Sequence, residues 1–323
     1  MLQDGFGRRI EYLRLSVTDR CDLRCSYCMP EKFKDYSEPE NWLGFDEIER
    51  LLSLFARLGL KRIRLTGGEP LLRRNLPALA GRLSVLPGID DLSLSTNGTQ
   101  LEKYAAALRR AGITRLNVSL DSLDRGKVHS ISKRDVLPQV LAGLEAARRE
   151  GFRLIKINMV AMATTTDDDI DAMTEYCIER GFVLRLIETM PLGDGGRKAG
   201  FLDLRPVQER LRRRFGLVDG VVPGGGPARY LVSPDGLFQI GFITPLSQHF
   251  CATCNRVRLG VDGILYLCLG QNDAIDFRKL LREGYSDADI EAAVLAGLRR
   301  KPRNHDFNGR RPQLVRVMSA TGG

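Results

Sequence analysis

Six of the seven cysteines in this 323-residue sequence fall into two tight groups. Cysteines clustered in this way, in a chain whose first residues show no apolar leader, indicate metal or redox chemistry rather than disulfide bonds. The seventh, Cys177, falls in a predicted helix, where we expect a packed and inert thiol. The two groups are Cys21, Cys25 and Cys28, and Cys251, Cys254 and Cys268.

The first group has the spacing C-x3-C-x2-C and directly follows a predicted strand. Three thiolates at this spacing can hold three irons of a [4Fe–4S] cluster and leave the fourth iron open to a ligand. A zinc site is the alternative, but zinc normally takes four protein ligands and no fourth Cys or His lies near this group. The spacing therefore predicts an oxygen-sensitive cluster with an open iron.

The second group pairs a C-x2-C with one cysteine further along the chain and has no convincing fourth ligand. His249 lies two residues before Cys251 and could complete a Cys3His zinc site. The residues alone leave two interpretations open, a zinc site and a second iron–sulfur cluster.

The elements that must position these groups begin as β-rich runs alternating with amphipathic helical runs. Six strand-then-helix units at about 30-residue spacing call for a parallel sheet with right-handed crossovers. Six units are fewer than the eight of a closed barrel, so the sequence predicts an α/β fold built as a partial, open TIM-type barrel. The predicted strands are 12–17, 62–66, 91–95, 115–120, 154–160 and 184–188, and the predicted helices are 45–58, 101–111, 136–150 and 168–180.

After about residue 200 the pattern changes to short hairpins between helices. We expect a C-terminal α+β segment that covers the barrel mouth. The sequence thus predicts two parts, residues 1–200 with the first cysteine group and residues 201–323 with the second. The expected elements of the second part are helices over 203–215, 274–283 and 287–300 and hairpin turns at 234–236 and 262–263.

The composition, 43% hydrophobic and 28% charged, is typical of a soluble globular protein. No apolar run approaches the roughly 20 residues needed to span a bilayer, so we expect a cytoplasmic protein without membrane contact. Much of the net charge of +9 comes from residues 201–323, with 18 Lys and Arg against 12 Asp and Glu. A basic region of this kind can favour a nucleotide or a nucleic acid, although a solvated surface is the more ordinary interpretation.

The first group, with Tyr27 before its last cysteine, resembles the radical S-adenosylmethionine superfamily. That resemblance implies a cluster whose open iron binds S-adenosylmethionine and whose electron releases a 5′-deoxyadenosyl radical. The run 66–70, Thr-Gly-Gly-Glu-Pro, resembles the Gly-Gly-Glu-Pro motif of the superfamily. Glycines there allow close approach of the backbone to the cofactor, and we expect carbonyls and Glu69 to receive its ammonium group.

Residues around the second group resemble a narrower family, the MoaA family of GTP 3′,8-cyclases of molybdenum cofactor biosynthesis. The resemblance covers essentially the whole chain, including 247–259, Ser-Gln-His-Phe-Cys-Ala-Thr-Cys-Asn-Arg-Val-Arg-Leu, the opening run 13–21 and the terminal Gly322 and Gly323. It implies a lyase that converts GTP to (8S)-3′,8-cyclo-7,8-dihydroguanosine 5′-triphosphate. The radical would take a hydrogen from the ribose C3′, and C3′ would then attack C8 of guanine.

The resemblance also implies a role for individual residues. Both cysteine groups would hold [4Fe–4S] clusters, and the free iron of the second would contact guanine. The glycine tail, Gly322 and Gly323, would reach into the active site. The positions matching S-adenosylmethionine contacts are Tyr27, Gly68, Ser119 and Met190, and those matching GTP contacts are Arg14, Arg64, Ser95, Lys156, Arg256, Val257 and Arg258.

The expected partners follow from the same family. They are a flavodoxin or ferredoxin as reductant, the next pathway enzyme, cyclic pyranopterin monophosphate synthase, and possible pairing as a homodimer. Two segments depart from the family pattern: Ile131-Ser132-Lys133-Arg134 stands where Thr-Gly-Arg is more usual, and Gly270 stands where Phe is typical.

Two other functions are weighed against this one. A peptide- or tetrapyrrole-modifying radical enzyme would typically carry more cysteines in its C-terminal part than the three found here. A zinc-stapled nucleic-acid-binding protein would fit the positive charge, but aromatic residues make up only 7% and the first cysteine group would remain unexplained. We therefore expect no nucleic-acid partner.

Overall fold

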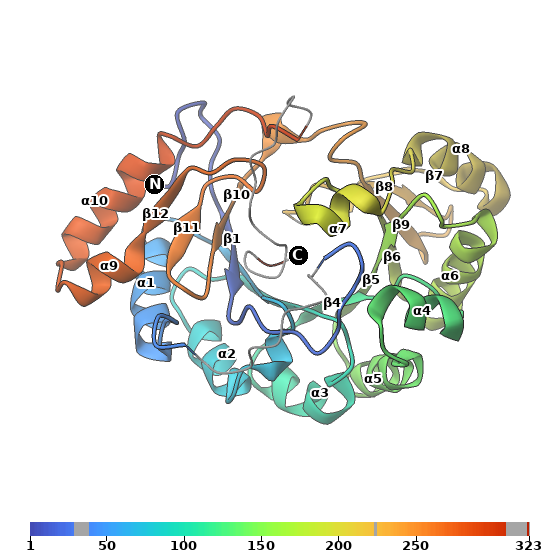
Figure 1. Ribbon diagram of the computed structural model, residues 1–323, viewed down its shortest axis with the longest axis horizontal. Helices are drawn as coiled ribbons and strands as arrows, with labels where there is room; N and C mark the ends of the chain where they lie inside the picture. The colour runs from blue at the N-terminus through green and yellow to red at the C-terminus, as the bar shows by residue number, and fades with distance from the viewer. Residues whose placement is uncertain (29–38, 223–224, 308–321, 323) are drawn as a thin grey trace.

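A single curved sheet of 12 strands forms the centre of the molecule, and most of the helices lie outside it (Figure 1). This computed structural model describes residues 1–28, 39–222, 225–307 and 322. The strands are β1 (Tyr12–Ser16), β2 (Arg62–Thr66), β3 (Asp91–Thr96), β4 (Arg115–Ser119), β5 (Leu154–Ala161), β6 (Val183–Glu188), β7 (Val218–Gly220), β8 (Arg229–Val232), β9 (Gln239–Ile243), β10 (Arg256–Leu259), β11 (Ile264–Tyr266) and β12 (Ala274–Asp276).

The six predicted strands form the middle of this sheet as parallel neighbours, β1 to β6 in chain order. Two strands of the C-terminal segment add to its two edges, β10 parallel to β1 and β9 parallel to β6. Antiparallel partners then extend each end, β11 and β12 beyond β10, and β8 and β7 beyond β9. In the sheet that the described residues form, the outermost strands, β12 and β7, are not paired with each other, so the predicted open barrel is confirmed.

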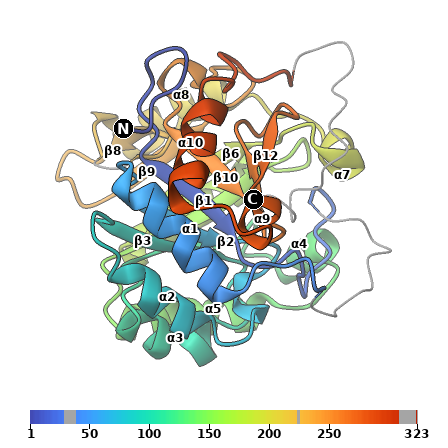
Figure 2. The same ribbon diagram turned by 90° about the vertical axis from the view of Figure 1, so that its left-hand side faces the viewer.

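The helices that cover the outer face begin and end largely where capping residues predict. In α6, the Thr166 hydroxyl accepts a hydrogen bond from Asp169 N, and Gly181 ends the helix with a φ of 68°. Figures 1 and 2 show α10 beside α1 on the outside of the sheet. The helices are α1 (Phe45–Arg57), α2 (Leu76–Ser84), α3 (Leu101–Arg110), α4 (Arg125–Ser132), α5 (Leu137–Arg149), α6 (Asp167–Arg180), α7 (Gly193–Lys198), α8 (Leu204–Phe215), α9 (Phe277–Arg282) and α10 (Asp287–Leu298), with short 3-10 turns η1 (Pro70–Leu72) and η2 (Cys251–Thr253).

Alternation along the strands separates a core face from a cavity face. In β1, Leu13 and Leu15 are fully buried in the hydrophobic core, whereas the intervening Arg14 lines the cavity inside the barrel. Each buried leucine contributes roughly 1.5–3 kcal/mol to folding. The inward-facing residues of β1 are therefore polar, whereas Val160, Ile187 and Ile243 add apolar surface to the same cavity.

Several sequence expectations differ from the structure in detail. The helix expected over 274–283 is wrong at its start, because Ala274–Asp276 pairs with β11 as strand β12 and only then does α9 begin, capped by Asp276. Three helices escaped prediction, α2, α4 and α7, which are short and contain Pro or Gly that weaken the helical pattern. Cys177 lies in α6 with none of its surface exposed, as expected.

The division of the chain at residue 200 stays a prediction, since strands from both parts share one sheet. None of the helices in the described ranges combines the length and apolar character needed to cross a bilayer.

Candidate active site

One cavity of about 300 Å³ lies inside the open barrel, and both cysteine groups line it. The groups are separated by more than 200 positions in the chain, yet β10 brings the second group beside the loop that follows β1. The cavity therefore places all six clustered cysteines, Cys21, Cys25, Cys28, Cys251, Cys254 and Cys268, around a common space.

The first cysteine loop is held by backbone hydrogen bonds to the end of α4. Arg24 N donates to Ser132 O at 3.0 Å, and Ser26 N donates to Ile131 O at 3.0 Å. Arg134 Nη1 adds a 3.1 Å bond to Asp22 O. Because Ile131 and Ser132 act through their carbonyls, the departure from the family pattern in this segment leaves the support of the loop intact.

Tyr27 anchors the same loop from inside. Its hydroxyl donates to Asp121 Oδ2 at 2.8 Å, and Asp121 Oδ1 accepts from Val160 N at 2.9 Å. Burial raises the pKa of Asp121 to about 6 and the pKa of the Cys28 thiol to about 11. A buried thiol of this kind becomes a ligand when a metal displaces its proton.

The geometry of the cysteines bears on the zinc interpretation. Within the ranges that the structure describes, no three His, Cys, Asp or Glu side chains lie close enough to hold one metal ion. Thiolates on a single zinc lie about 3.8 Å apart, given Zn–S bonds of about 2.3 Å, whereas a cubane places each thiolate on a different iron. A [4Fe–4S] cluster therefore does not require the three cysteines of a group to meet at one metal ion.

Two glycines bring the backbone against the cysteine loop. A Cβ on Gly67 would collide with the carbonyl oxygen of Thr18, and one on Gly68 would collide with that of Arg20. Both glycines also line the cavity. Packing therefore excludes any residue larger than glycine at positions 67 and 68. The backbone at the end of β2 can approach a bound cofactor closely.

The expectation that Glu69 receives the ammonium group of a cofactor stays a prediction. Glu69 has none of its surface exposed and does not line the cavity. Its carboxylate accepts from Leu71 N at 3.0 Å, Thr96 Oγ1 at 2.7 Å and Asn97 N at 2.6 Å. Burial raises the pKa of Glu69 to about 8, and the carboxyl group serves to tie the end of β3 to the glycine turn.

The other positions matched to S-adenosylmethionine lie together. Tyr27, Gly68, Ser119 and Met190 all line the cavity, although they come from four different strand ends or loops. Met190 packs against Leu192 in a small apolar cluster that is separate from the main core. The cavity wall beside the first cysteine group is thus partly apolar and partly glycine backbone.

Of the positions matched to GTP, six line the same cavity, and Lys156 lines a smaller pocket next to it. The Val257 side chain packs in the hydrophobic core, so only its backbone is available to a ligand. Strand register explains the clustering, because Arg14 pairs with Arg64 on one side and with Arg258 on the other.

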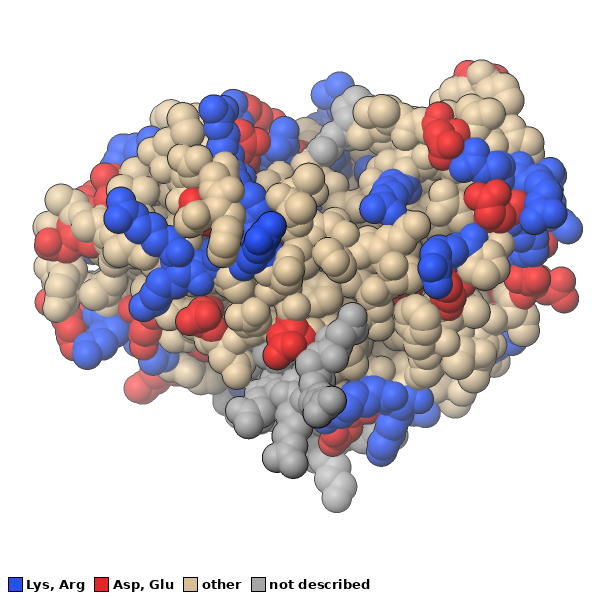
Figure 3. All heavy atoms as spheres, turned by 90° about the horizontal axis from the view of Figure 1, so that it is seen from above, with Lys and Arg blue, Asp and Glu red and all other residues tan. Residues whose placement is uncertain are grey.

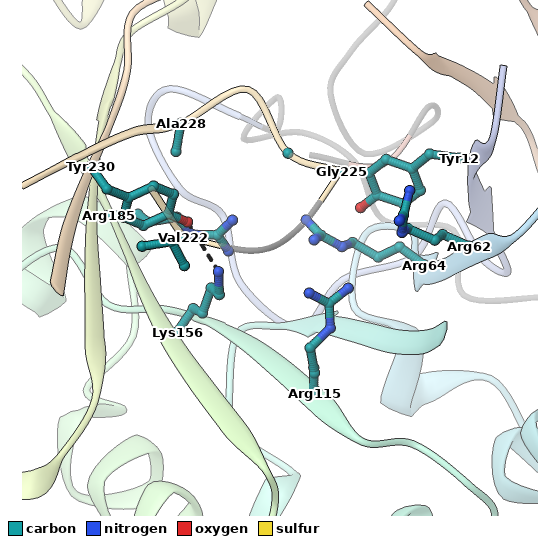
Figure 4. A pocket seen from close by; sticks show the side chains of 11 residues that line it. Tyr12, Arg62, Arg64, Arg115, Lys156, Arg185, Val222, Gly225, Ala228 and Tyr230 are labelled. Atoms are coloured by element: carbon teal, nitrogen blue, oxygen red, sulfur yellow. Dashed lines mark hydrogen bonds between the residues drawn. The ribbon is translucent and has the colours of Figure 1, made fainter. Parts of the chain in front are cut away.

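The smaller pocket gathers further cations that the sequence analysis missed (Figure 4). Figure 4 shows the side chains of Arg62, Arg64, Arg115, Lys156 and Arg185 converging from β2, β4, β5 and β6. A signal was present in the sequence: charged or polar residues alternate with apolar ones in β2 and β4, and Lys156 and Arg185 each lie between two apolar residues. Alternation shows which residues share a face, and these cations share the face of Arg14.

The neighbouring positive charges perturb one another strongly. Burial, together with Arg185, Arg115 and Arg64, lowers the pKa of Lys156 to about 7. Burial and Arg64 lower the pKa of Arg185 to about 10. Lys156 Nζ donates to Tyr230 OH at 3.0 Å, which is a neutral partner. A polyanion entering this pocket would relieve the repulsion.

Several buried polar atoms on the cavity wall have no hydrogen-bond partner within the described part of the chain. An orphaned buried donor or acceptor costs about 1–3 kcal/mol, so such atoms point to a ligand. They include Tyr12 OH, Arg14 Nε, Ser95 Oγ, Asn158 Oδ1, Arg185 Nε and Arg256 Nε. The N–H and O–H groups among them can donate to the phosphate and base oxygens of a nucleotide.

Gly270, two residues after Cys268, packs against the segment that follows α10. Cys254 N donates to Cys251 O at 3.1 Å within η2. A Cβ on Gly270 would lie 2.8 Å from His305 Cβ and 3.2 Å from Phe307 Cε1. The Phe307 ring thus occupies the space next to Gly270, which accounts for the departure from the family's Phe at that position.

The penultimate residue lies inside the barrel. Arg258 Nη1 donates to the Gly322 carbonyl oxygen, and a Cβ on Gly322 would collide with Thr66. Gly322 is buried and has a φ of 75°. Gly323 lies outside the described residues.

The surface gives little support to a nucleic-acid-binding function. Figure 3 shows basic and acidic side chains interspersed over the face seen from above. Many arginines of the basic C-terminal part have acidic partners, for example Arg205 with Asp203 at 2.6 Å and Arg212 with Asp219 at 2.8 Å. Five cationic residues line the smaller pocket, where they can reach a small polyanion.

Comparisons with known proteins agree with this geometry. The radical SAM superfamily matches residues 15–177, and the family described as Molybdenum Cofactor Synthesis C matches residues 182–307. A GTP 3′,8-cyclase from Ectopseudomonas mendocina is 45% identical, over 100% of this chain and 98% of that protein. A GTP 3′,8-cyclase from Erythrobacter litoralis is 46% identical, over 100% of this chain and 98% of that protein.

Solved structures share the fold. Streptococcus suis SuiB bound to S-adenosylmethionine has a TM-score of 0.66 and 14% identity, and the match covers 97% of this chain and 78% of that chain. Coproporphyrinogen III oxidase HemN from Escherichia coli has a TM-score of 0.52 and 16% identity, over 79% of this chain and 60% of that chain.

Proposed function

This chain belongs to the family of the GTP 3′,8-cyclases within the radical S-adenosylmethionine superfamily, and we propose how the residues around its cavity divide the reaction. It is a lyase that converts GTP to (8S)-3′,8-cyclo-7,8-dihydroguanosine 5′-triphosphate, the first step of molybdenum cofactor synthesis. It uses two [4Fe–4S] clusters and S-adenosylmethionine.

The first region of the cavity would activate the cofactor. Cys21, Cys25 and Cys28 would hold the first cluster, which when bound supplies, with S-adenosylmethionine, a one-electron cleavage that yields a carbon radical. Gly68 would admit the cofactor close to the backbone, and Tyr27 would keep the loop in place through its bond to Asp121. Met190 and its apolar neighbours would keep water from this end.

The second region would bind the triphosphate. Lys156, Arg64, Arg115 and Arg185 form a cationic pocket, and Tyr230 closes one side of it. Arginine forks match phosphate oxygens in pairs, and a buried position strengthens each contact. Each charged contact contributes about 1.5–3 kcal/mol to nucleotide binding.

The third region would hold the base. Cys251, Cys254 and Cys268 would bind the second cluster, next to Arg256 and Arg258 at the start of the nucleotide cavity. The reaction joins the ribose C3′ to C8 of guanine, so both atoms must be held between the two clusters. Fixing the base at one end and the phosphates at the other achieves this positioning.

A single observation carries the proposal: both cysteine groups and the cationic residues face adjoining parts of one barrel interior. A peptide-modifying enzyme would have no need of five converging cations.

Other parts of the proposal rest on the family alone. They are an electron donor such as a flavodoxin or ferredoxin, hand-over of the product to cyclic pyranopterin monophosphate synthase, and a homodimer. The division of the chain at residue 200 rests on the change of sequence pattern there. A cytoplasmic location is supported by the seven free cysteines, because thiols and clusters persist in a reducing compartment.

The test is an anaerobic assay of the reconstituted protein with dithionite, S-adenosylmethionine and GTP, analysed by mass spectrometry. We expect 5′-deoxyadenosine together with the cyclised triphosphate. The Cys21→Ser variant should form neither product. The Cys251→Ser variant should keep the first cluster but should not form the cyclised product. Formation of 5′-deoxyadenosine by the wild-type protein without consumption of GTP would refute the assigned substrate.

A further inference from the structure

Lys301 is a buried cation at the second cysteine group that the mechanism above does not use. Only 2% of its surface is exposed. Its ammonium group donates to Arg256 O at 2.9 Å and also to Leu267 O. Among the described residues it forms no ion pair with a carboxylate, which is unusual for a buried lysine.

The two carbonyls that Lys301 binds belong to the segments that carry the cysteines. Arg256 follows Cys254 by two residues, and Leu267 directly precedes Cys268. Lys301 therefore links these two segments across the base of the second group. The remaining cysteine of the group, Cys251, is held in a similar way, because Arg8 Nη1 donates to Cys251 O at 2.7 Å.

The charged groups around Lys301 also relate it to the second cysteine group. Burial lowers the pKa of Lys301, and the thiolates of Cys254 and Cys268 act in the opposite direction. Two other charged neighbours, Arg8 and Arg256, are cations and cannot neutralise the positive charge of Lys301. Among the groups with the largest effect on Lys301, the two that favour its charged form are Cys254 and Cys268.

We propose that Lys301 is a positioning residue that serves as the fixed counter-charge of the second cluster and stabilises its reduced form. The inference rests on the proposed function, in which this cysteine group holds a [4Fe–4S] cluster. Three thiolates leave such a cluster with net negative charge, and one electron from an external low-potential reductant makes it more negative. A nearby fixed ammonium group stabilises the reduced form more than the oxidised form and raises the reduction potential.

The experiment isolates the second cluster in the full-length chain. The background protein carries Cys21→Ser, Cys25→Ser and Cys28→Ser, which remove the first cluster. Three variants are compared in that background: Lys301→Met, Lys301→Arg and, as a matched control, Lys279→Met on the exposed face of α9. Iron content is measured first. A dithionite-mediated redox titration followed by electron paramagnetic resonance then gives the reduction potential of the cluster.

We expect Lys301→Met to lower the potential, so that the ratio of reduced to oxidised cluster at a fixed solution potential falls about tenfold, or about 59 mV for one electron. Lys301→Arg and Lys279→Met should match the background. Loss of iron from the methionine variant but not from the arginine variant would equally support a need for the charge.

Two results would overturn the inference while leaving the proposed function intact. One is an unchanged potential in Lys301→Met with its full iron content, and the other is equal loss of iron from the methionine and arginine variants. A background protein that binds no iron at all would overturn the cluster assignment itself, and this inference with it.

Discussion

Replacing Lys156 with methionine is expected to stabilise the unliganded protein while weakening its binding of GTP. Lys156 is 5% exposed and lies among Arg64, Arg115 and Arg185, and its hydrogen-bond partner Tyr230 is neutral. Folding therefore brings a lysine into a field of like charge. Methionine keeps most of the apolar volume of the side chain and removes the charge.

The magnitude follows from the lowered pKa. The pKa of Lys156 falls from 10.5 to about 7, so between these pH values the unfolded chain binds more protons than the folded one. At about 1.4 kcal/mol per pKa unit, keeping this lysine buried costs on the order of 4 kcal/mol at pH 7. The cost is present in full below pH 7 and disappears as the pH approaches 10.5. Loss of the Tyr230 hydrogen bond offsets about 1 kcal/mol.

Binding should respond in the opposite direction, because phosphate oxygens would supply the negative charge that Lys156 lacks. Loss of one charged contact should weaken GTP binding about 10- to 150-fold. The wild-type protein should also take up a proton when it binds GTP above pH 7, and the methionine variant should not. Urea unfolding at pH 6.5 and 9.5 and anaerobic calorimetry in buffers of different ionisation enthalpy measure these quantities.

Lys103→Met, on the exposed face of α3, is the matched control and should change neither quantity. If Lys156→Met were instead less stable than the wild type at pH 6.5 and bound GTP with unchanged affinity, the electrostatic account of this pocket would be refuted.

Three other changes test the remaining regions of the cavity. Gly68→Ala should weaken S-adenosylmethionine binding at least about tenfold while leaving GTP affinity unchanged, because its Cβ would collide with the Arg20 carbonyl; equilibrium dialysis of both ligands checks this. Arg256→Met should weaken GTP binding about 10- to 150-fold by calorimetry, and an unchanged affinity would contradict its assignment. Deletion of Gly322 and Gly323 should leave the iron content of both clusters unchanged and abolish the cyclised product, and normal turnover would contradict a role for the tail.

The parts of the site that could be predicted from the sequence are those set by local spacing. Cys21, Cys25 and Cys28 lie within one loop, so their separation along the chain limits the group that they can bind. The strand pattern likewise predicts the six parallel strands at the centre of the sheet, because periodicity and glycine-terminated helices are local features.

The sequence prediction failed at the start of α9, where the segment can form either a helix or a strand. The run 274–276 has residues compatible with a helix, and pairing with β11 makes it a strand. A long-range contact that local propensity does not record decides this outcome.

The amino-acid sequence by itself determined which residues can bind iron and, in strands such as β2 and β4, which face is polar. Only the tertiary structure decided that these features meet. The pairing of β10 with β1 carries the second cysteine group to the first, and the register of β2, β4, β5 and β6 brings Arg62, Arg115 and Arg185 to Lys156. The physical reason is that alternation along a strand specifies a face, whereas the neighbours of a residue on that face depend on strand order and register.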